Sequence, residues 1–158
     1  MKAMILAAGK GTRLGPLNAD VPKVMMPVGG QPLLCRTFVW LKSHGITQVA
    51  LNLHYKGQKI IDLVGSGAGY GMNVTYSHEK TLLGTAGGVK TMQPFFDGTF
   101  VVVYGDILTD FDLTAMIEYH RRKHAVATIA LVTVSDPAHY GIVETAVDGQ
   151  VTCFLEKP

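Results

Sequence analysis

Residues 3–14 read AMILAAGKGTRL, a short apolar run that leads directly into a glycine-rich loop. The apolar part, Ala3–Ala8, has no polar face and predicts a strand that is buried on both sides. Small residues in the loop allow backbone N–H groups to converge on an anion, which is how such loops bind phosphates. Lys10, Arg13 and, further along the chain, Lys23 supply positive charge. Arg and Lys side chains directed at one place suit a triphosphate.

The glycine-rich loop matches neither of two familiar nucleotide-binding motifs. A dinucleotide fingerprint requires a third glycine where this chain has Leu14, and a Walker A loop requires a glycine where it has Met4. The first mismatch, together with the lack of an acidic residue ending the expected second strand, disfavours a dinucleotide-dependent oxidoreductase. The loop therefore indicates a phosphate site of another kind.

Strand-like and helix-like segments alternate along the rest of the chain. Strands are expected at residues 48–53, 73–76, 100–104 and 127–134, and the 73–76 strand is polar enough to lie at a sheet edge. Helices are expected at residues 33–44, ending at Gly45, at 56–64, and at 113–123, capped by Asp112. A hairpin is expected around Asp148-Gly149, between strands at 142–145 and 151–155.

This alternation predicts an α/β fold, a Rossmann-like three-layer sandwich in which helices cover both faces of a mainly parallel sheet. The length of 158 residues predicts one domain over residues 1–158. In such sheets ligands bind beyond the carboxyl ends of the strands. The loops that follow the expected strands are therefore where a site is to be sought.

The composition excludes several classes of protein and partner. With 47% hydrophobic and 16% charged residues, the chain is neither a disordered tail nor a coiled coil. A net charge of +2 and no basic run longer than residues 121–123 predict no nucleic-acid and no membrane partner. Two cysteines form no disulfide framework, and the apolar N-terminal run is too short for a signal peptide, so we expect a cytoplasmic protein.

The stretch Leu6–Leu14, together with the Pro22-Lys23 pair, resembles the signature of the sugar-1-phosphate nucleotidyltransferases, LAAGxGTRL followed by Pro-Lys. A further matching segment is LGTAGG at residues 83–88, which resembles the second nucleotide loop of the family, the loop that lies against the base and ribose. Other matching segments are YGD at 104–106, YGIV at 140–143 and FLEKP at 154–158. The LGTAG motif, with NLHY at residues 52–55, is most similar to the mannose-1-phosphate guanylyltransferase branch. The resemblance implies the nucleotidyltransferase type of Rossmann-like fold.

The resemblance also implies which residues form the site. The expected nucleotide-binding residues are Ala8, Gly9, Gly11, Thr12, Arg13, Lys23, Glu79, Gly84 and Thr85. The expected sugar-phosphate-binding residues are Gly105, Tyr140, Gly141, Glu156 and Lys157. Arg13, Lys23 and Asp106 are the expected catalytic residues, and Asp106 is the expected ligand of Mg²⁺.

From the residues alone, four of these positions have alternatives. Asp106 follows a strand, where a carboxylate suits Mg²⁺ but also commonly caps a turn. The Glu79 carboxylate could accept from the two adjacent donors of guanine, or could be a solvated loop residue. Glu156 and Lys157 could bind a sugar and its phosphate, or form an exposed ion pair.

The expected function is magnesium-dependent transfer of a nucleotidyl group from a nucleoside triphosphate, GTP favoured, to a sugar 1-phosphate, mannose 1-phosphate favoured. The alternative is a regulatory or inactive homologue that binds nucleotide and senses rather than transfers. Because members of the family run well past 158 residues, we expect this chain to be the N-terminal, nucleotide-binding portion of a longer domain. An unpaired sheet edge or apolar patch is then expected, which would favour a homo-oligomer.

Overall fold

The computed structural model describes residues 1–11, 15, 20–136 and 140–155. The chain forms two compact units, Met1–Phe111 and Asp112–Pro158. The prediction of one domain over residues 1–158 stays a prediction. No helix within the described ranges is long and apolar enough to span a bilayer.

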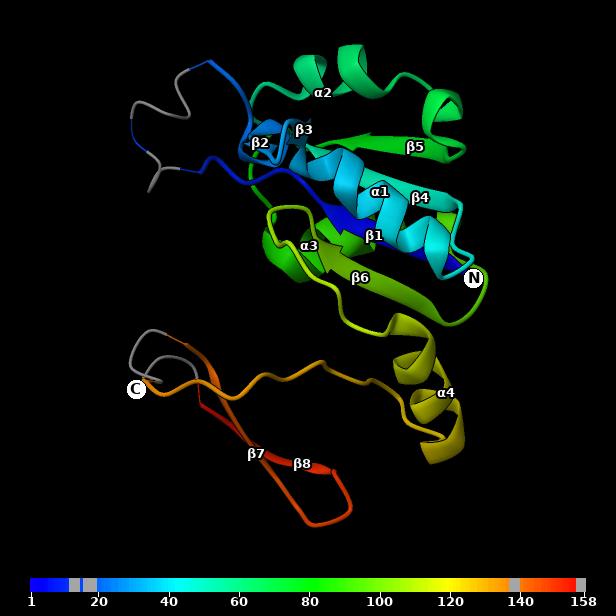
Figure 1. Ribbon diagram of the computed structural model, residues 1–158, viewed down its shortest axis with the longest axis vertical. Helices are drawn as coiled ribbons and strands as arrows, with labels where there is room; N and C mark the ends of the chain where they lie inside the picture. The colour runs from blue at the N-terminus through cyan, green and yellow to red at the C-terminus, as the bar shows by residue number, and fades with distance from the viewer. Residues whose placement is uncertain (12–14, 16–19, 137–139, 156–158) are drawn as a thin grey trace. The chain divides into compact units, whose positions relative to one another are not determined.

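A four-stranded parallel sheet lies at the centre of the first unit, in the order β5-β4-β1-β6 (Figure 1). Its strands are β1 (Lys2–Leu6), β4 (Gln48–Leu53), β5 (Asn73–His78) and β6 (Phe100–Tyr104). The predicted parallel sheet is therefore confirmed, and β5 lies at an edge as expected. The opposite edge is β6, whose Val102 and Tyr104 side chains are exposed.

Helices cover both faces of this sheet, which confirms the three-layer arrangement. Figure 1 shows α1 (Leu33–Ser43) in front of the sheet and α3 (Gly84–Thr91) behind it. The remaining elements of the unit are α2 (Gly57–Val64), the short hairpin β2 (Pro27–Val28) and β3 (Gln31–Pro32), and the 3-10 turns η2 (Lys23–Met25), η3 (Ala68–Tyr70) and η4 (Gln93–Phe95).

The central strand β1 is buried on both faces, as its uninterrupted apolar run predicts. Met4 packs with Ala50 and Met92 on the face that α3 and η4 cover. Ile5, whose side chain points to the opposite face, is also fully buried. Burial on both faces explains why β1 reads as a continuous apolar run rather than as an alternating one.

The order of the strands places a ligand crevice at the end of β1. From β1 the chain winds through α1 to β4 and through α2 to β5, and α3 then returns it to β6 on the other side of β1. Such a reversal of winding opens a crevice beyond the carboxyl ends of the strands. The register makes these ends level, since Leu6 lies beside Asn52 on one side and Tyr104 on the other.

Two expectations about local structure differ from what the fold shows. The LGTAGG segment was expected as a loop, but α3 begins at Gly84 and incorporates it. Glycine is a poor helix former, so its tertiary packing overrides its propensity here. The strand expected at residues 127–134 is wrong, because that segment has no regular structure and its Ile129, Leu131 and Val132 side chains are exposed. A β-branched run forms a strand only where a neighbouring strand pairs with it.

The second unit contains α4 (Leu113–Lys123) and an antiparallel pair, β7 (Ile142–Thr145) and β8 (Val151–Leu155). The predicted cap of α4 is confirmed, since Asp112 Oδ1 accepts a 3.0 Å hydrogen bond from the Ala115 amide. The predicted hairpin is also confirmed, and Gly149 occupies its turn with a φ of +86°. That left-handed conformation favours glycine over any other residue.

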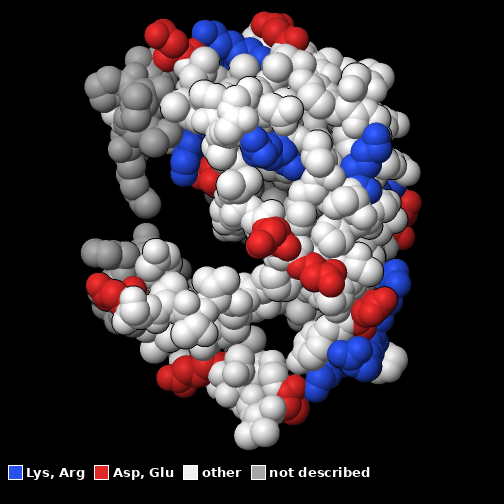
Figure 2. Space-filling model, in the orientation of Figure 1, with Lys and Arg blue, Asp and Glu red and all other residues white. Residues whose placement is uncertain are grey.

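Acidic and basic side chains are interspersed over the visible face of the Met1–Phe111 unit (Figure 2). This face therefore presents no broad basic surface of the kind that tracks a nucleic-acid backbone.

Candidate active site

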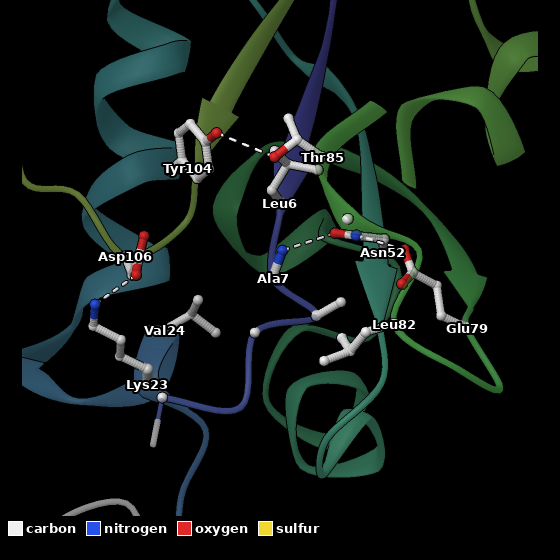
Figure 3. A pocket seen from close by; sticks show the side chains of 14 residues that line it. Leu6, Ala7, Lys23, Val24, Asn52, Glu79, Leu82, Thr85, Tyr104 and Asp106 are labelled. Atoms are coloured by element: carbon white, nitrogen blue, oxygen red, sulfur yellow. Dashed lines mark hydrogen bonds and ion pairs between the residues drawn. The ribbon is translucent and has the colours of Figure 1, made fainter. Parts of the chain in front are cut away.

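A cavity of about 470 Å³ lies in the first unit at the carboxyl ends of β1, β4, β5 and β6 (Figure 3). Its volume falls within the range of roughly 300–1,000 Å³ typical of small-molecule sites. The residues that line it are Leu6, Ala7, Ala8, Gly9, Gly11, Lys23, Val24, Asn52, Glu79, Leu82, Gly84, Thr85, Tyr104 and Asp106. The fold therefore gathers eight of the predicted site residues around one space: Ala8, Gly9, Gly11, Lys23, Glu79, Gly84, Thr85 and Asp106.

The glycine-rich loop after β1 forms one wall of the cavity. A Cβ atom added to Gly9 would meet no atom within 4 Å, so protein packing does not itself require glycine there. Gly11 has a φ of +63°, a conformation that favours glycine. Because Gly9 and Gly11 carry no side chains, the backbone at these two positions is open to a ligand. The predicted residues Thr12 and Arg13 lie outside the described residues.

Lys23 and Asp106 form an ion pair at the side of the cavity, with 2.5 Å between Lys23 Nζ and Asp106 Oδ2. Lys23 begins η2, and Asp106 follows β6 after a single glycine. Their side chains are 38% and 33% exposed, so both remain accessible to a ligand. The pair therefore holds one cation and one carboxylate together in the lining of the cavity.

Gly105 holds Asp106 in place by close packing and does not itself line the cavity. Its amide donates a 2.9 Å hydrogen bond to Leu6 O, which continues the β1–β6 pairing beyond the strand. A Cβ at Gly105 would lie 3.0 Å from Val24 Cγ1 and 3.1 Å from Ile5 Cγ2. A larger residue would therefore push the Asp106 loop away from β1. Its predicted contact with a sugar phosphate stays a prediction.

Asn52 and Glu79 lie across the cavity from the ion pair (Figure 3) and are both buried, 3% and 6% exposed. Asn52 Oδ1 accepts a 2.8 Å hydrogen bond from the Ala7 amide, and Asn52 Nδ2 donates a 2.7 Å hydrogen bond to Glu79 Oε1. Glu79 Oε2 accepts a 3.0 Å hydrogen bond from the Leu83 amide. The solvated-loop alternative for Glu79 is therefore wrong, because its carboxylate is buried and hydrogen-bonded.

The first turn of α3 forms another wall of the cavity. Gly84 and Thr85 line the cavity, and Thr85 Oγ1 lies 3.1 Å from the hydroxyl of Tyr104, with which it shares a hydrogen bond. Gly84 has a φ of +71° and no atom near the position of a Cβ. The N-terminus of α3 thus opens toward the cavity, where its free N–H groups favour a negatively charged ligand.

The predicted sugar-phosphate residues belong mostly to the second unit. Tyr140 is 55% exposed and, with Gly141, precedes β7. Glu156 and Lys157 lie outside the described residues. Their roles therefore stay predictions, and the alternative of an exposed ion pair for Glu156 and Lys157 is equally untested.

Asn52 and Tyr104 line the cavity but were not expected as site residues. Both end or nearly end a strand of the parallel sheet, and this placement is a signal that the sequence carries. A polar residue such as Asn52 within an otherwise apolar strand was the stronger signal of the two.

The fold and the cavity together define an α/β protein whose strand-end cavity is lined by a glycine-rich loop, a paired lysine and carboxylate, and a buried polar floor formed by Asn52 and Glu79. Residues 2–158 match the family described as Nucleotidyl transferase, and the chain belongs to that family. The resemblance drawn from the LAAGxGTRL signature is thereby confirmed.

Three relatives illustrate the range of this family. The chain is 41% identical over 172 residues to a UTP–glucose-1-phosphate uridylyltransferase of Synechocystis sp., covering 100% of this chain and 44% of the relative. It is 36% identical over 156 residues to a mannose-1-phosphate guanylyltransferase of Mycobacterium tuberculosis, covering 98% and 44%. The crystal structure of HddC from Yersinia pseudotuberculosis complexed with GMP-PN has a TM-score of 0.81 at 31% identity, covering 99% of this chain and 69% of that one.

These comparisons agree on the chemistry and differ on the substrates. The two named transferases use different bases and different sugars. The chain also spans less than half the length of these two curated relatives. Family membership therefore does not by itself assign the base, the sugar or the activity of this chain.

Proposed function

We propose that this protein takes part in the transfer of a nucleotidyl group from a nucleoside triphosphate to a sugar 1-phosphate, with release of pyrophosphate. The observation that carries the proposal is the convergence of the loop after β1, Lys23 and Asp106 on one cavity in a chain of this family. A phosphate oxygen of the sugar 1-phosphate forms a bond to the α-phosphorus. The bond from that phosphorus to the β-phosphate bridging oxygen breaks, and pyrophosphate leaves with the electron pair.

The residues of the site act in this proposal by binding and orienting. The attacking oxygen is already anionic, so no general base is required. The open backbone of Gly9 and Gly11 and the Lys23 ammonium would hold the triphosphate with its α-phosphorus exposed to attack. Arg13, which the signature places in the same loop, is proposed as a second cation. Positive groups fixed beside the phosphates stabilise charge that shifts toward the leaving pyrophosphate.

The donor set of the cavity fits Mg²⁺ through a single carboxylate. Asp106 would hold the ion, and Mg²⁺ is commonly bound by one or two carboxylates together with substrate phosphates. Within the described part of the chain, no group of three or more metal-ligating side chains is present. When bound, the ion would neutralise phosphate charge. Lys23 would then exchange its contact with Asp106 for one with the phosphates.

We assign guanine as the base because of Glu79. Guanine presents two adjacent donors, N1–H and the 2-amino group, which one carboxylate can accept together. A carboxylate has about four lone-pair sites; the hydrogen bonds from Asn52 and Leu83 occupy two of the Glu79 sites, which leaves two for a base. Glu79 lies across the cavity from Lys23 and Asp106 (Figure 3), as a base must from its phosphates. The relative solved with GMP-PN supports this choice.

Mannose 1-phosphate is the proposed acceptor. The LGTAG motif at residues 83–87 and the mycobacterial mannose-1-phosphate guanylyltransferase among the relatives support this proposal. Gly105, Tyr140, Gly141, Glu156 and Lys157 are proposed to bind this substrate. A cytoplasmic location is proposed with it.

Pyrophosphate release from GTP, ATP, UTP and CTP, each with a panel of sugar 1-phosphates, tests the proposal directly. We expect release with GTP and mannose 1-phosphate to exceed every other pair. Calorimetric titration of the same nucleotides provides a second readout that is independent of turnover. Tight nucleotide binding without pyrophosphate release would favour the regulatory alternative, and preferred use of UTP would refute the assignment of guanine to Glu79.

A further inference from the structure

A chain of three hydrogen bonds crosses the floor of the cavity and joins segments that are far apart in the sequence. It runs from the Ala7 amide to Asn52, from Asn52 to Glu79, and from Glu79 to the Leu83 amide, over distances of 2.8, 2.7 and 3.0 Å. Its two ends are the loop after β1 and the segment that leads into α3. These are the two backbone segments proposed to hold the phosphates and the base.

The direction of each hydrogen bond in the chain is fixed by its ends. The Ala7 amide can only donate, so Asn52 must turn its carbonyl oxygen toward β1. The Glu79 carboxylate can only accept when ionised, so the amino group of Asn52 must face it. A side chain at position 52 must therefore accept on one side and donate on the other. Ionised aspartate, leucine and alanine cannot do both.

Close packing surrounds this chain of hydrogen bonds on the side away from the cavity. Asn52 and Glu79 are buried, and the α3 backbone covers them at Gly88, where a Cβ would lie 2.6 Å from Asn52 Nδ2. Two further contacts hold the backbone of Glu79 to β4, a 2.8 Å hydrogen bond from its amide to Leu53 O and a 2.8 Å contact from its carbonyl to His54 Nδ1. A buried polar chain in which each side chain is hydrogen-bonded at both ends favours one geometry, and it leaves the remaining lone pairs of Glu79 for a base.

We infer that Asn52 is a positioning residue: through Glu79 it sets the phosphate-binding loop after β1 against the segment that binds the base, and it touches neither reacting atom. The inference rests on the proposed function, which supplies the roles of the two segments. It also separates two tasks of Glu79. One is to accept the Asn52 and Leu83 hydrogen bonds, and the other is to present its remaining lone pairs to a base.

An exchange of the two side-chain chemistries isolates the positioning task. In Asn52→Asp, two carboxylates would face each other where a donor met an acceptor. In Glu79→Gln, the new amide faces a donor from Asn52 and another from the Leu83 backbone. Only its oxygen can accept, so its own amino group is directed at one of the two donors and that hydrogen bond is lost. In the double variant Asn52→Asp/Glu79→Gln, Asp accepts from Ala7 and from the Gln amino group, and the Gln oxygen accepts from Leu83. All three hydrogen bonds are thereby restored without a carboxylate at position 79.

The probe for the phosphate segment is inorganic tripolyphosphate, which has no base. We expect each single variant to raise the Kd of tripolyphosphate about tenfold, because each leaves a buried polar group without a hydrogen-bond partner. The double variant should return the Kd to within about twofold of the parent, since the hydrogen-bond chain is complete again. Exchange of the Ala7 amide, followed by NMR, should accelerate in both single variants and slow again in the double variant. Asn73→Asp and Glu118→Gln make the same chemical changes at exposed positions and should change neither readout.

The outcomes separate this inference from the proposed function. If the double variant regains tripolyphosphate binding but loses its preference for GTP over UTP, both the positioning role of Asn52 and the base-reading role of Glu79 are supported. If it regains both, the positioning role stands and the assignment of guanine to Glu79 fails. A double variant as weak as the single variants overturns the inference. So does a parent chain that binds neither tripolyphosphate nor GTP, because the hydrogen-bond chain would then serve packing alone.

Discussion

Replacing Gly88 by alanine measures how closely α3 must approach the polar floor of the cavity. Gly88 lies within α3, and a Cβ there would stand 2.6 Å from Asn52 Nδ2 and 2.9 Å from Glu79 Oε1. Atoms at these separations overlap, so either α3 moves outward or the hydrogen bond between Asn52 and Glu79 breaks. Helix propensity acts in the opposite direction, because alanine stabilises a helix interior by about 1 kcal/mol relative to glycine.

The change in the free energy of unfolding that we expect for Gly88→Ala is the difference between these two opposing contributions. A hydrogen bond to a charged group contributes about 1.5–3 kcal/mol to the free energy of unfolding. Subtracting the gain in helix propensity leaves a net loss of about 0.5–2 kcal/mol for Gly88→Ala. For a chain of this size such a loss lowers the melting temperature by roughly 4 °C. Nucleotide affinity should fall as well, since the same displacement moves the first turn of α3.

Thermal unfolding by circular dichroism and calorimetric titration with GTP would check both effects. Gly69→Ala is the matched control, because a Cβ at Gly69 would meet no atom within 4 Å. We expect that control to be neutral or slightly stabilising, by up to about 1 kcal/mol. A Gly88→Ala variant that melts at or above the temperature of the parent and binds GTP equally well would refute the close-packing argument.

Other perturbations test the ion pairs and the sheet edge. Asp106→Asn should leave the circular dichroism spectrum unchanged and abolish pyrophosphate release; turnover within about threefold of the parent, a cost under roughly 0.7 kcal/mol, would exclude a metal-binding role. Lys23→Met should cost on the order of 2–4 kcal/mol in transition-state stabilisation, measured as kcat/KM for the triphosphate. Val102→Lys, at the exposed edge strand β6, should abolish any concentration-dependent association seen by light scattering, whereas equal association of variant and parent would place the contact elsewhere. The hydrogen bond and charge of Lys2 lower the pKa of the exposed Asp97 carboxyl, so the stabilising effect of that pair is present above the ordinary pKa near 3.8 and is lost as the pH falls through the lowered value. Asp97→Asn should therefore lower the melting temperature slightly at neutral pH and leave it unchanged in strong acid.

Local patterns in the sequence were sufficient for the elements whose causes are local. The uninterrupted apolar run of β1 predicts burial on both faces, and the structure buries it so. The glycine after α1, Gly45, has a φ of +75° and ends that helix where it was expected to end. The turn of the second hairpin at Gly149 follows the same reasoning. In each case a few neighbouring residues determine the conformation, through burial pattern or backbone sterics.

Tertiary packing determined the rest, including the most informative part of the site. The helix at Gly84–Thr91 contains a glycine-rich segment that local propensity disfavours, and it forms where Gly88 allows close approach to Asn52 and Glu79. The apolar run at 127–134 has strand-like composition, and no strand pairs with it among the described residues. The composition of a segment alone cannot show whether a neighbouring strand is present to pair with it.

Residue patterns along the chain were enough to predict the kind of chemistry: a glycine-rich loop after a buried strand, a lysine suited to phosphates, a carboxylate suited to Mg²⁺, and a family signature that contains the loop and the lysine. Only the tertiary structure showed that Ala7, Asn52 and Glu79 are joined, across 45 and 27 residues of sequence. The physical reason is the parallel sheet. Its strands are brought into register by crossovers rather than by adjacent turns, so which strand ends meet depends on the packing of the whole unit.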